Sequence, residues 1–63
     1  MGVFDKNKVA DQWIAEYGEE AAWHAAQKIG ELMEWEDHEG AYAWVEVLAI
    51  IEERARARKS SGA

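Results

Sequence analysis

The sequence predicts an all-α protein, and three observations support this fold class. Hydrophobic residues make up 49% of the chain, which is enough to build a packed core and unlike a disordered segment. Proline is absent, so every residue can donate a backbone N–H to a helix. Apolar residues recur at steps of three and four through three successive segments, as one face of a helix requires. A chain of 63 residues has room for one small domain.

The first helix is predicted over residues 5–17. Asp5 is its expected N-cap, because its carboxylate can accept from the free amides of the first turn. Gly18 follows directly and favours a break, since glycine adopts the left-handed conformation that closes a helix; a single kinked helix through Gly18 is the alternative. The apolar residues of this segment share one face: Val9, Ala10, Trp13, Ile14 and Tyr17.

The second helix is predicted over residues 19–35. Its apolar side begins with alanines, which let another helix approach closely, and ends with larger residues that fill a wider gap. That side consists of Ala22, Ala25, Ala26, Ile29, Leu32 and Met33. The opposite face, which includes His24, is expected to be solvated. Residues 36–40 form the only dense polar cluster between two apolar stretches, so they are predicted to be a turn.

The third helix is predicted over residues 38–59, with Asp37 as its N-cap and residues 60–63 as a frayed tail. Its apolar seam alternates steps of three and four through Ala41, Trp44, Leu48, Ile51 and Ala55. Ala43, Val47 and Ile50 lie beside that seam, and Val45 lies beyond its other edge.

The apolar arc of the third helix spans well over half of its circumference, and one partner helix cannot cover so wide an arc. The second helix covers part of it, and the rest must meet the first helix, another subunit or another protein. We therefore expect a short N-terminal helix followed by an antiparallel helical hairpin, paired as a homodimer in a four-helix type of bundle.

Charge is distributed unevenly along the chain. Residues 1–53 hold three basic and all thirteen acidic residues, a net charge of −10, whereas residues 54–63 hold four basic residues, a net charge of +4. The acidic body should repel phosphate backbones, so nucleic-acid binding is not expected. The cations at the end complement the dipole of the third helix.

Several kinds of chemistry are not expected. The absence of cysteine excludes disulfides, thiolate metal sites and a cysteine nucleophile. The glycines at 18, 30 and 40 are isolated, so no phosphate-binding loop is predicted. A core this small cannot spare the water-excluding pocket that acid–base catalysis needs. We expect no enzyme activity, no cofactor and no small-molecule substrate. No apolar run at the start is long enough for a signal peptide or membrane span, which predicts a cytoplasmic protein without membrane association.

A divalent-metal-binding helical module is the alternative function. Glu20 and His24 stand one helical turn apart and could offer a carboxylate and an imidazole to one ion. The turn adds a second cluster, formed by Glu34, Glu36, Asp37, His38 and Glu39. Its register differs from that of an EF-hand loop, and an ordinary capped turn is the competing interpretation.

Four tryptophans in so short a chain favour a contact surface, because Trp is enriched at interface hot spots. The predicted partner-binding residues are Trp13, Trp23, Trp35, Val47 and Ile50. Trp35 could instead fold over the turn onto the third helix. The leading hypothesis is a non-enzymatic interaction protein, a regulatory or accessory subunit that binds a protein partner or itself. An acidic decoy that imitates nucleic acid toward a basic partner is a weaker possibility.

The order of landmarks resembles an uncharacterised family of short all-helical bacterial proteins, a domain of unknown function. The resemblance covers roughly residues 9–53. It rests on Tyr17-Gly18-Glu19-Glu20-Ala21, on Ala25, Ala26 and Ile29, on Asp37-x-x-Gly40-x-x-x-Trp44, and on Ile51 shortly before a charged tail. It implies a small cytoplasmic helical protein and assigns no catalytic residue, cofactor or substrate.

Overall fold

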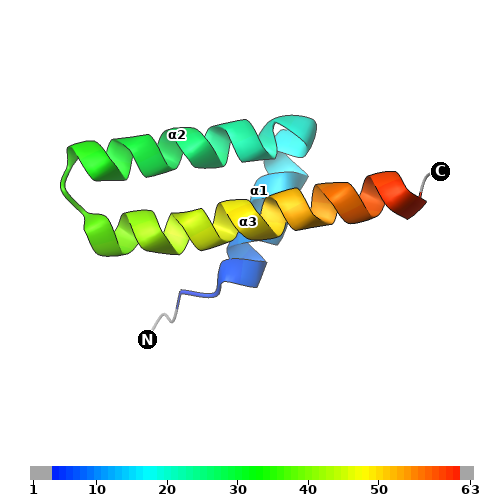
Figure 1. Cartoon of the computed structure of the whole chain (residues 1–63), viewed down its shortest axis with the longest axis horizontal. Helices are drawn as coiled ribbons and strands as arrows, with labels where there is room; N and C mark the ends of the chain where they lie inside the picture. The colour runs from blue at the N-terminus through cyan, green and yellow to red at the C-terminus, as the bar shows by residue number, and fades with distance from the viewer. Residues whose placement is uncertain (1–3, 62–63) are drawn as a thin grey trace.

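The computed structural model describes residues 4–61, which form three α-helices and one 3-10 turn (Figure 1). Helix α1 covers Lys6–Tyr17, the 3-10 turn η1 covers Gly18–Glu20, α2 covers Ala21–Glu34 and α3 covers His38–Ser61. No strand occurs within residues 4–61. The prediction of an all-helical fold is therefore confirmed.

Helices α2 and α3 lie side by side and run in opposite directions, and α1 crosses them on one side only (Figure 1). At a rise of about 1.5 Å per residue, α3 is roughly 36 Å long and α2 roughly 21 Å. The C-terminal part of α3 therefore projects past the start of α2, and the molecule measures 41 × 26 × 17 Å. The flat shape leaves one broad face of the α2–α3 layer without a covering helix.

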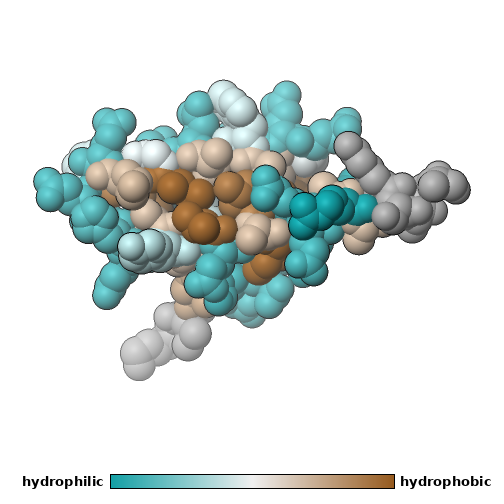
Figure 2. Space-filling view, viewed as in Figure 1, coloured by the Kyte–Doolittle hydropathy of each residue, from teal (hydrophilic) through white to brown (hydrophobic). Residues whose placement is uncertain are grey.

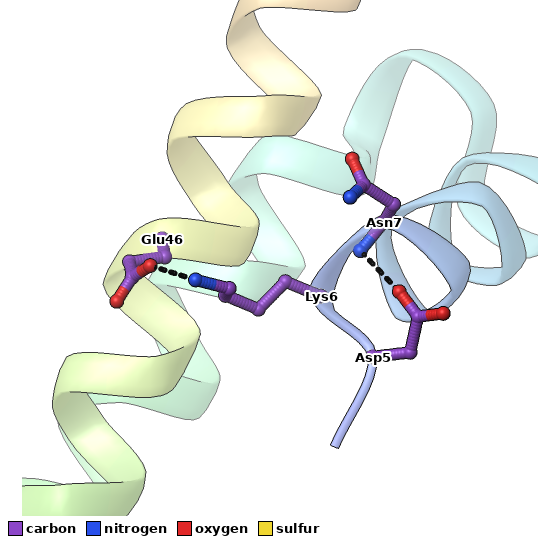
Figure 3. Close-up of polar contacts among 4 residues, drawn as sticks. All are labelled: Asp5, Lys6, Asn7 and Glu46. Carbon is purple, nitrogen blue, oxygen red and sulfur yellow. Dashed lines mark hydrogen bonds and ion pairs between the residues drawn. The ribbon is translucent and has the colours of Figure 1, made fainter. Parts of the chain in front are cut away.

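The helix ends follow local chemistry. The Asp5 carboxylate accepts a hydrogen bond from the backbone N–H of Asn7 at 3.1 Å (Figure 3). It also accepts one from the backbone N–H of Lys8 at 3.2 Å, which confirms Asp5 as the N-cap of α1. Asp37 accepts from the Gly40 N–H at 3.0 Å and begins α3 in the same way. Gly18 has φ +59°, a conformation that favours glycine, so the predicted break is confirmed.

Three predicted boundaries are corrected. Helix α2 begins at Ala21 rather than at residue 19, because residues 18–20 form the tighter η1 turn after Gly18. It ends at Glu34, just before Glu36 leaves helical geometry with φ +58°. Helix α3 continues through Ser61, two residues beyond its predicted end. Residues 62 and 63 of the predicted frayed tail lie outside the described residues.

The core forms where all three helices meet. Its fully buried members are Ala10, Ala21, Ala25, Val47 and Ile51. Three of these five are alanines from α1 and α2, and their small side chains let the helix backbones approach α3 closely. Larger side chains such as Trp44 and Leu48 are half-buried around this centre.

Two ion pairs connect α1 to α3 at the surface. Lys6 pairs with Glu46 (Figure 3), and Asp11 pairs with Arg54. All four side chains are substantially exposed, and such pairs contribute about 0 to 1 kcal/mol each. Apolar packing therefore holds α1 in place, and the ion pairs mark which side of α3 it covers.

Candidate interaction surface

A row of aromatic rings follows the junction between α1 and the other two helices. Each ring contacts the next in the order Phe4, Trp44, Trp13, Tyr17, His24 and Trp23, with centroid separations between 3.9 and 6.4 Å. Tilted and edge-to-face pairs of this kind add about 0.5–1.5 kcal/mol each beyond their buried area. The row therefore stabilises the contact of α1 with α2 and α3, and most of its aromatic surface is used inside the chain.

The environment of His24 differs from the sequence prediction. Its imidazole stacks on the Tyr17 ring at a centroid distance of 3.9 Å and meets the edge of Trp23, so it is not on a fully solvated face. The periodicity of α2 could not reveal this, because Tyr17 reaches His24 only after the chain bends at Gly18. One carboxylate is close: Glu20 Oε1 lies 3.7 Å from His24 Nε2.

Three of the five predicted partner-binding residues belong to the chain's own interior. Val47 is 0% exposed, which corrects its prediction as a contact residue. Ile50 is half-buried against the same core, where α1 crosses α3. Trp13 is half-buried between Tyr17 and Trp44, and its buried Nε1 has no hydrogen-bond partner among the residues that the structure describes. Helix α1 therefore covers the part of the α3 arc that these residues occupy.

Trp23 and Trp35 are exposed, at 59% and 82% respectively. At 82% exposure Trp35 is not folded over the turn onto α3. The two indoles stand at opposite ends of α2, twelve residues or roughly 18 Å apart along its axis. They do not form one surface with each other or with the other three predicted residues.

A different apolar surface lies on the face that α1 leaves open. On α3, Arg54 contacts α1, and Val45 stands nine residues earlier, about two and a half turns away and so on the opposite side. On α2, His24 contacts α1, and Met33 stands nine residues later, again on the opposite side. Val45 and Met33 are 47% and 56% exposed. Both helices thus direct apolar residues away from α1.

We call this surface the outer stripe. It consists of Ala22, Ala26, Ile29 and Met33 from α2 and of Tyr42, Val45 and Ala49 from α3, all exposed or half-buried. Figure 2 shows an apolar band along the junction of α2 and α3 on this face, with polar residues on both sides of it. The sequence partly indicated the outer stripe, because Val45 is apolar and lies beyond the edge of the predicted core seam of the third helix. Tyr42 was missed because nothing in the periodicity of the core seam indicated it.

A shallow groove of about 300 Å³ lies beside the η1 turn and shares Ala22 with the outer stripe. Its apolar lining comes from Ile14, Ala22, Ile51 and Ala55, and Glu19 and Arg58 add charged groups to the lining. A cavity of this volume is at the small end for organic ligands and matches the size of a single large side chain. The groove therefore belongs to the place where the η1 turn brings α1, α2 and α3 together, and not to the open face alone.

The two clusters proposed for metal binding do not converge on one point. Within the part of the chain that the structure describes, no three His, Asp or Glu side chains are placed to hold a metal ion. Asp37 is engaged as the N-cap of α3, and the space in front of Gly40 is filled by the Asp37 side chain. Gly40 therefore makes room for its own helix cap.

Comparison with known proteins assigns no family. No family model, curated protein or solved structure matches this chain. Among the described residues, no helix combines the length and apolar character needed to cross a membrane. The class of protein defined by the fold is a small three-helix protein with one uncovered apolar face.

Proposed function

We propose that this chain is a non-enzymatic interaction protein, a small regulatory or accessory subunit that binds a protein partner or a second copy of itself through the outer stripe. The proposal includes a dimeric bundle in which the α2–α3 hairpin of one chain packs on another. The observation that carries it is that Met33 of α2 and Val45 of α3 are both exposed on the face opposite α1.

The energetic argument concerns the apolar surface left over after folding. Burying a large apolar side chain completely contributes about 1.5–3 kcal/mol, and 56%, 47% and 71% of the surface is still exposed at Met33, Val45 and Tyr42. These residues lie on the same open face of the α2–α3 layer, which is the arrangement expected of a contact surface and not of scattered surface residues. A helical partner that lies along the stripe would recover this energy.

The alternative of a metal-binding module has less support. Glu20 is the one carboxylate paired with His24 at ion-pair distance in the described part of the chain, and a stable site for a divalent ion needs three or more protein ligands. The interaction hypothesis draws on a continuous surface, so we prefer it.

Site-specific photo-crosslinking in the native cell tests the proposal. A benzoylphenylalanine at Val45 should give a covalent adduct of defined mass, because the outer stripe is buried against a protein for much of the time. The matched control is the same group at Gln12, which is exposed on α1. A probe at Val45 that gives no more adduct than the probe at Gln12 contradicts the proposed function, whatever the partner.

A further inference from the structure

We propose that the partner of the outer stripe is a second copy of this chain, packed face to face with α3 against α3 and α2 against α2 in antiparallel orientation. This inference rests on the proposed function, and it adds the identity of the partner and its direction. The argument comes from three properties of the stripe: the symmetry of its residue spacing, the sizes of its side chains, and the charges at its two ends.

Helix α3 carries a second seam on its outer side. The residues follow one another at steps of four, three, four, three and four: His38, Tyr42, Val45, Ala49, Glu52 and Arg56. All six are exposed, and the alternation of three and four is that of a helix–helix contact. The series is symmetric about position 47. An antiparallel pair centred there brings Val45 opposite Ala49, Tyr42 opposite Glu52, and His38 opposite Arg56.

Each of the two central pairings is chemically favourable. Val45 meets the small Ala49, so the two backbones can approach closely while the larger side chain fills the gap. The Tyr42 hydroxyl can donate a hydrogen bond to the Glu52 carboxylate of the other copy, and a bond to a charged acceptor is stronger than one between neutral groups. A parallel α3–α3 pair would instead place Glu52 beside Glu52 and Arg56 beside Arg56.

The outer stripe of α2 has the same kind of symmetry. Its residues Ala22, Ala26, Ile29 and Met33 are separated by steps of four, three and four. Residues equally far from the turn lie level in the two helices, so an axis through position 47 of α3 crosses α2 near Ala25. Antiparallel pairing about this axis places Ala22 of one copy opposite Ile29 of the other and brings the two copies of Ala26 together. These small side chains let the two α2 helices approach closely.

Charge at the two ends of the molecule favours the same direction. The turn contains four carboxylates between residues 34 and 39, and residues 54–59 contain four cations and no acid. Figure 2 shows strongly hydrophilic residues over the C-terminal part of α3, at the opposite end of the apolar band from the turn. Antiparallel packing brings Arg56 of each copy to the acidic turn of the other, whereas an arrangement with both turns at one end gathers like charges.

The uncovered face is large enough for such a contact. A stable interface needs about 600 Å² or more from each partner, and the whole molecule extends over 41 by 26 Å in its two longer directions. Two copies stacked on it would form a four-helix layer arrangement with an α1 on each outer side. Each α1 would leave the contact undisturbed, because it lies on the opposite face of its own chain.

Disulfide trapping tests the orientation, because the chain has no cysteine of its own. His38 and Arg56 are exposed and 18 residues apart, about 27 Å along α3. A disulfide requires Cα atoms within about 7 Å. Purified His38→Cys and Arg56→Cys proteins, mixed and oxidised, should give a mixed disulfide dimer in most of the material. Each variant oxidised alone should give little dimer, and circular dichroism checks that both are folded.

The outcomes separate this inference from the proposed function. A mixed disulfide as the main product supports the antiparallel dimer. Efficient trapping of either variant with itself, or no mixed product, overturns it. If the photo-adduct at Val45 in the cell has the mass of a different protein, the second copy is also excluded, although the interaction function stands.

Discussion

The two faces of the α2–α3 layer differ in one respect, which is the presence of α1. On the covered face, Val47 is fully buried against alanines of α1 and α2. On the open face, Val45 is 47% exposed only two residues away on the same helix. Two valines of equal size thus have opposite environments, because α1 is too short and too tightly turned at Gly18 to wrap both sides. The comparison shows that one protomer covers most of the apolar arc of α3 but leaves Val45, at the edge of the arc, exposed.

The most direct test of this difference between the two faces is to place the same charge on each of them. Val47→Asp should abolish folding, because an unpaired carboxylate buried in a small core costs several kcal/mol, which is comparable to the whole stability of a domain of this size. Val45→Asp should change the free energy of unfolding of the protomer by about 0.5 kcal/mol or less. Urea denaturation followed by circular dichroism at low protein concentration measures both. Equal destabilisation by the two variants would contradict the assigned faces.

A second matched pair lies on α2. Ala25→Leu should destabilise the chain by about 1–3 kcal/mol, because Ala25 is fully buried where α2 approaches α3 and the added atoms have no space. Ala26→Leu, one residue further and exposed, should change stability by about 0.5 kcal/mol or less. Thermal unfolding of dilute samples measures the stability of both variants. An Ala25→Leu variant as stable as the wild type would contradict the close approach of α2 to α3 at this position.

The turn that brings α1 onto the covered face offers a third test. Gly18→Ala should cost roughly 1–2 kcal/mol, because φ +59° is strained for any residue with a Cβ. Gly30→Ala is the control, since the space beside this helical glycine is open, and it should stabilise α2 by about 0.5–1 kcal/mol. Chemical denaturation should therefore show a lower free energy of unfolding for Gly18→Ala and a higher one for Gly30→Ala. A stabilising Gly18→Ala would mean that α1 and α2 can join as one helix.

The smallest effect is expected from the ion pairs between α1 and α3. Replacing both Lys6 and Asp11 by alanine should lower stability by about 1 kcal/mol or less, because these exposed pairs are weakened by solvent. Raising the salt concentration should reduce the difference between the variant and the wild type. A much larger loss would mean that charge, and not packing of Ala10 and Trp13, holds α1 against α3.

Local signals in the sequence predicted the local structure well. Asp5 and Asp37 were identified as helix caps and Gly18 as a break, because each of these depends on neighbouring residues only. The core seam of α3 was placed partly correctly: Ala41 and Ile51 are buried, and Trp44 and Leu48 are half-buried.

The candidate site could not be predicted in the same way. Whether Val47 or Val45 faces the interior depends on the direction that α1 takes after Gly18, and helical periodicity carries no information on that direction. For the same reason His24 was expected in solvent, whereas Tyr17 covers it. The tryptophans were misleading, because Trp13 serves the packing of α1 and Trp35 stands apart at the turn.

Sedimentation equilibrium of the wild type and of Val45→Asp, from micromolar to millimolar concentration, tests the central claim most directly. The open face should bring two chains together, so the wild-type mass should rise from 7.1 kDa toward twice that value as concentration increases. Val45→Asp, with unchanged helix content, should stay at the mass of one chain. A wild type that remains at 7.1 kDa throughout, or a variant that dimerises equally well, would contradict the claim that a second copy covers the face left open by α1.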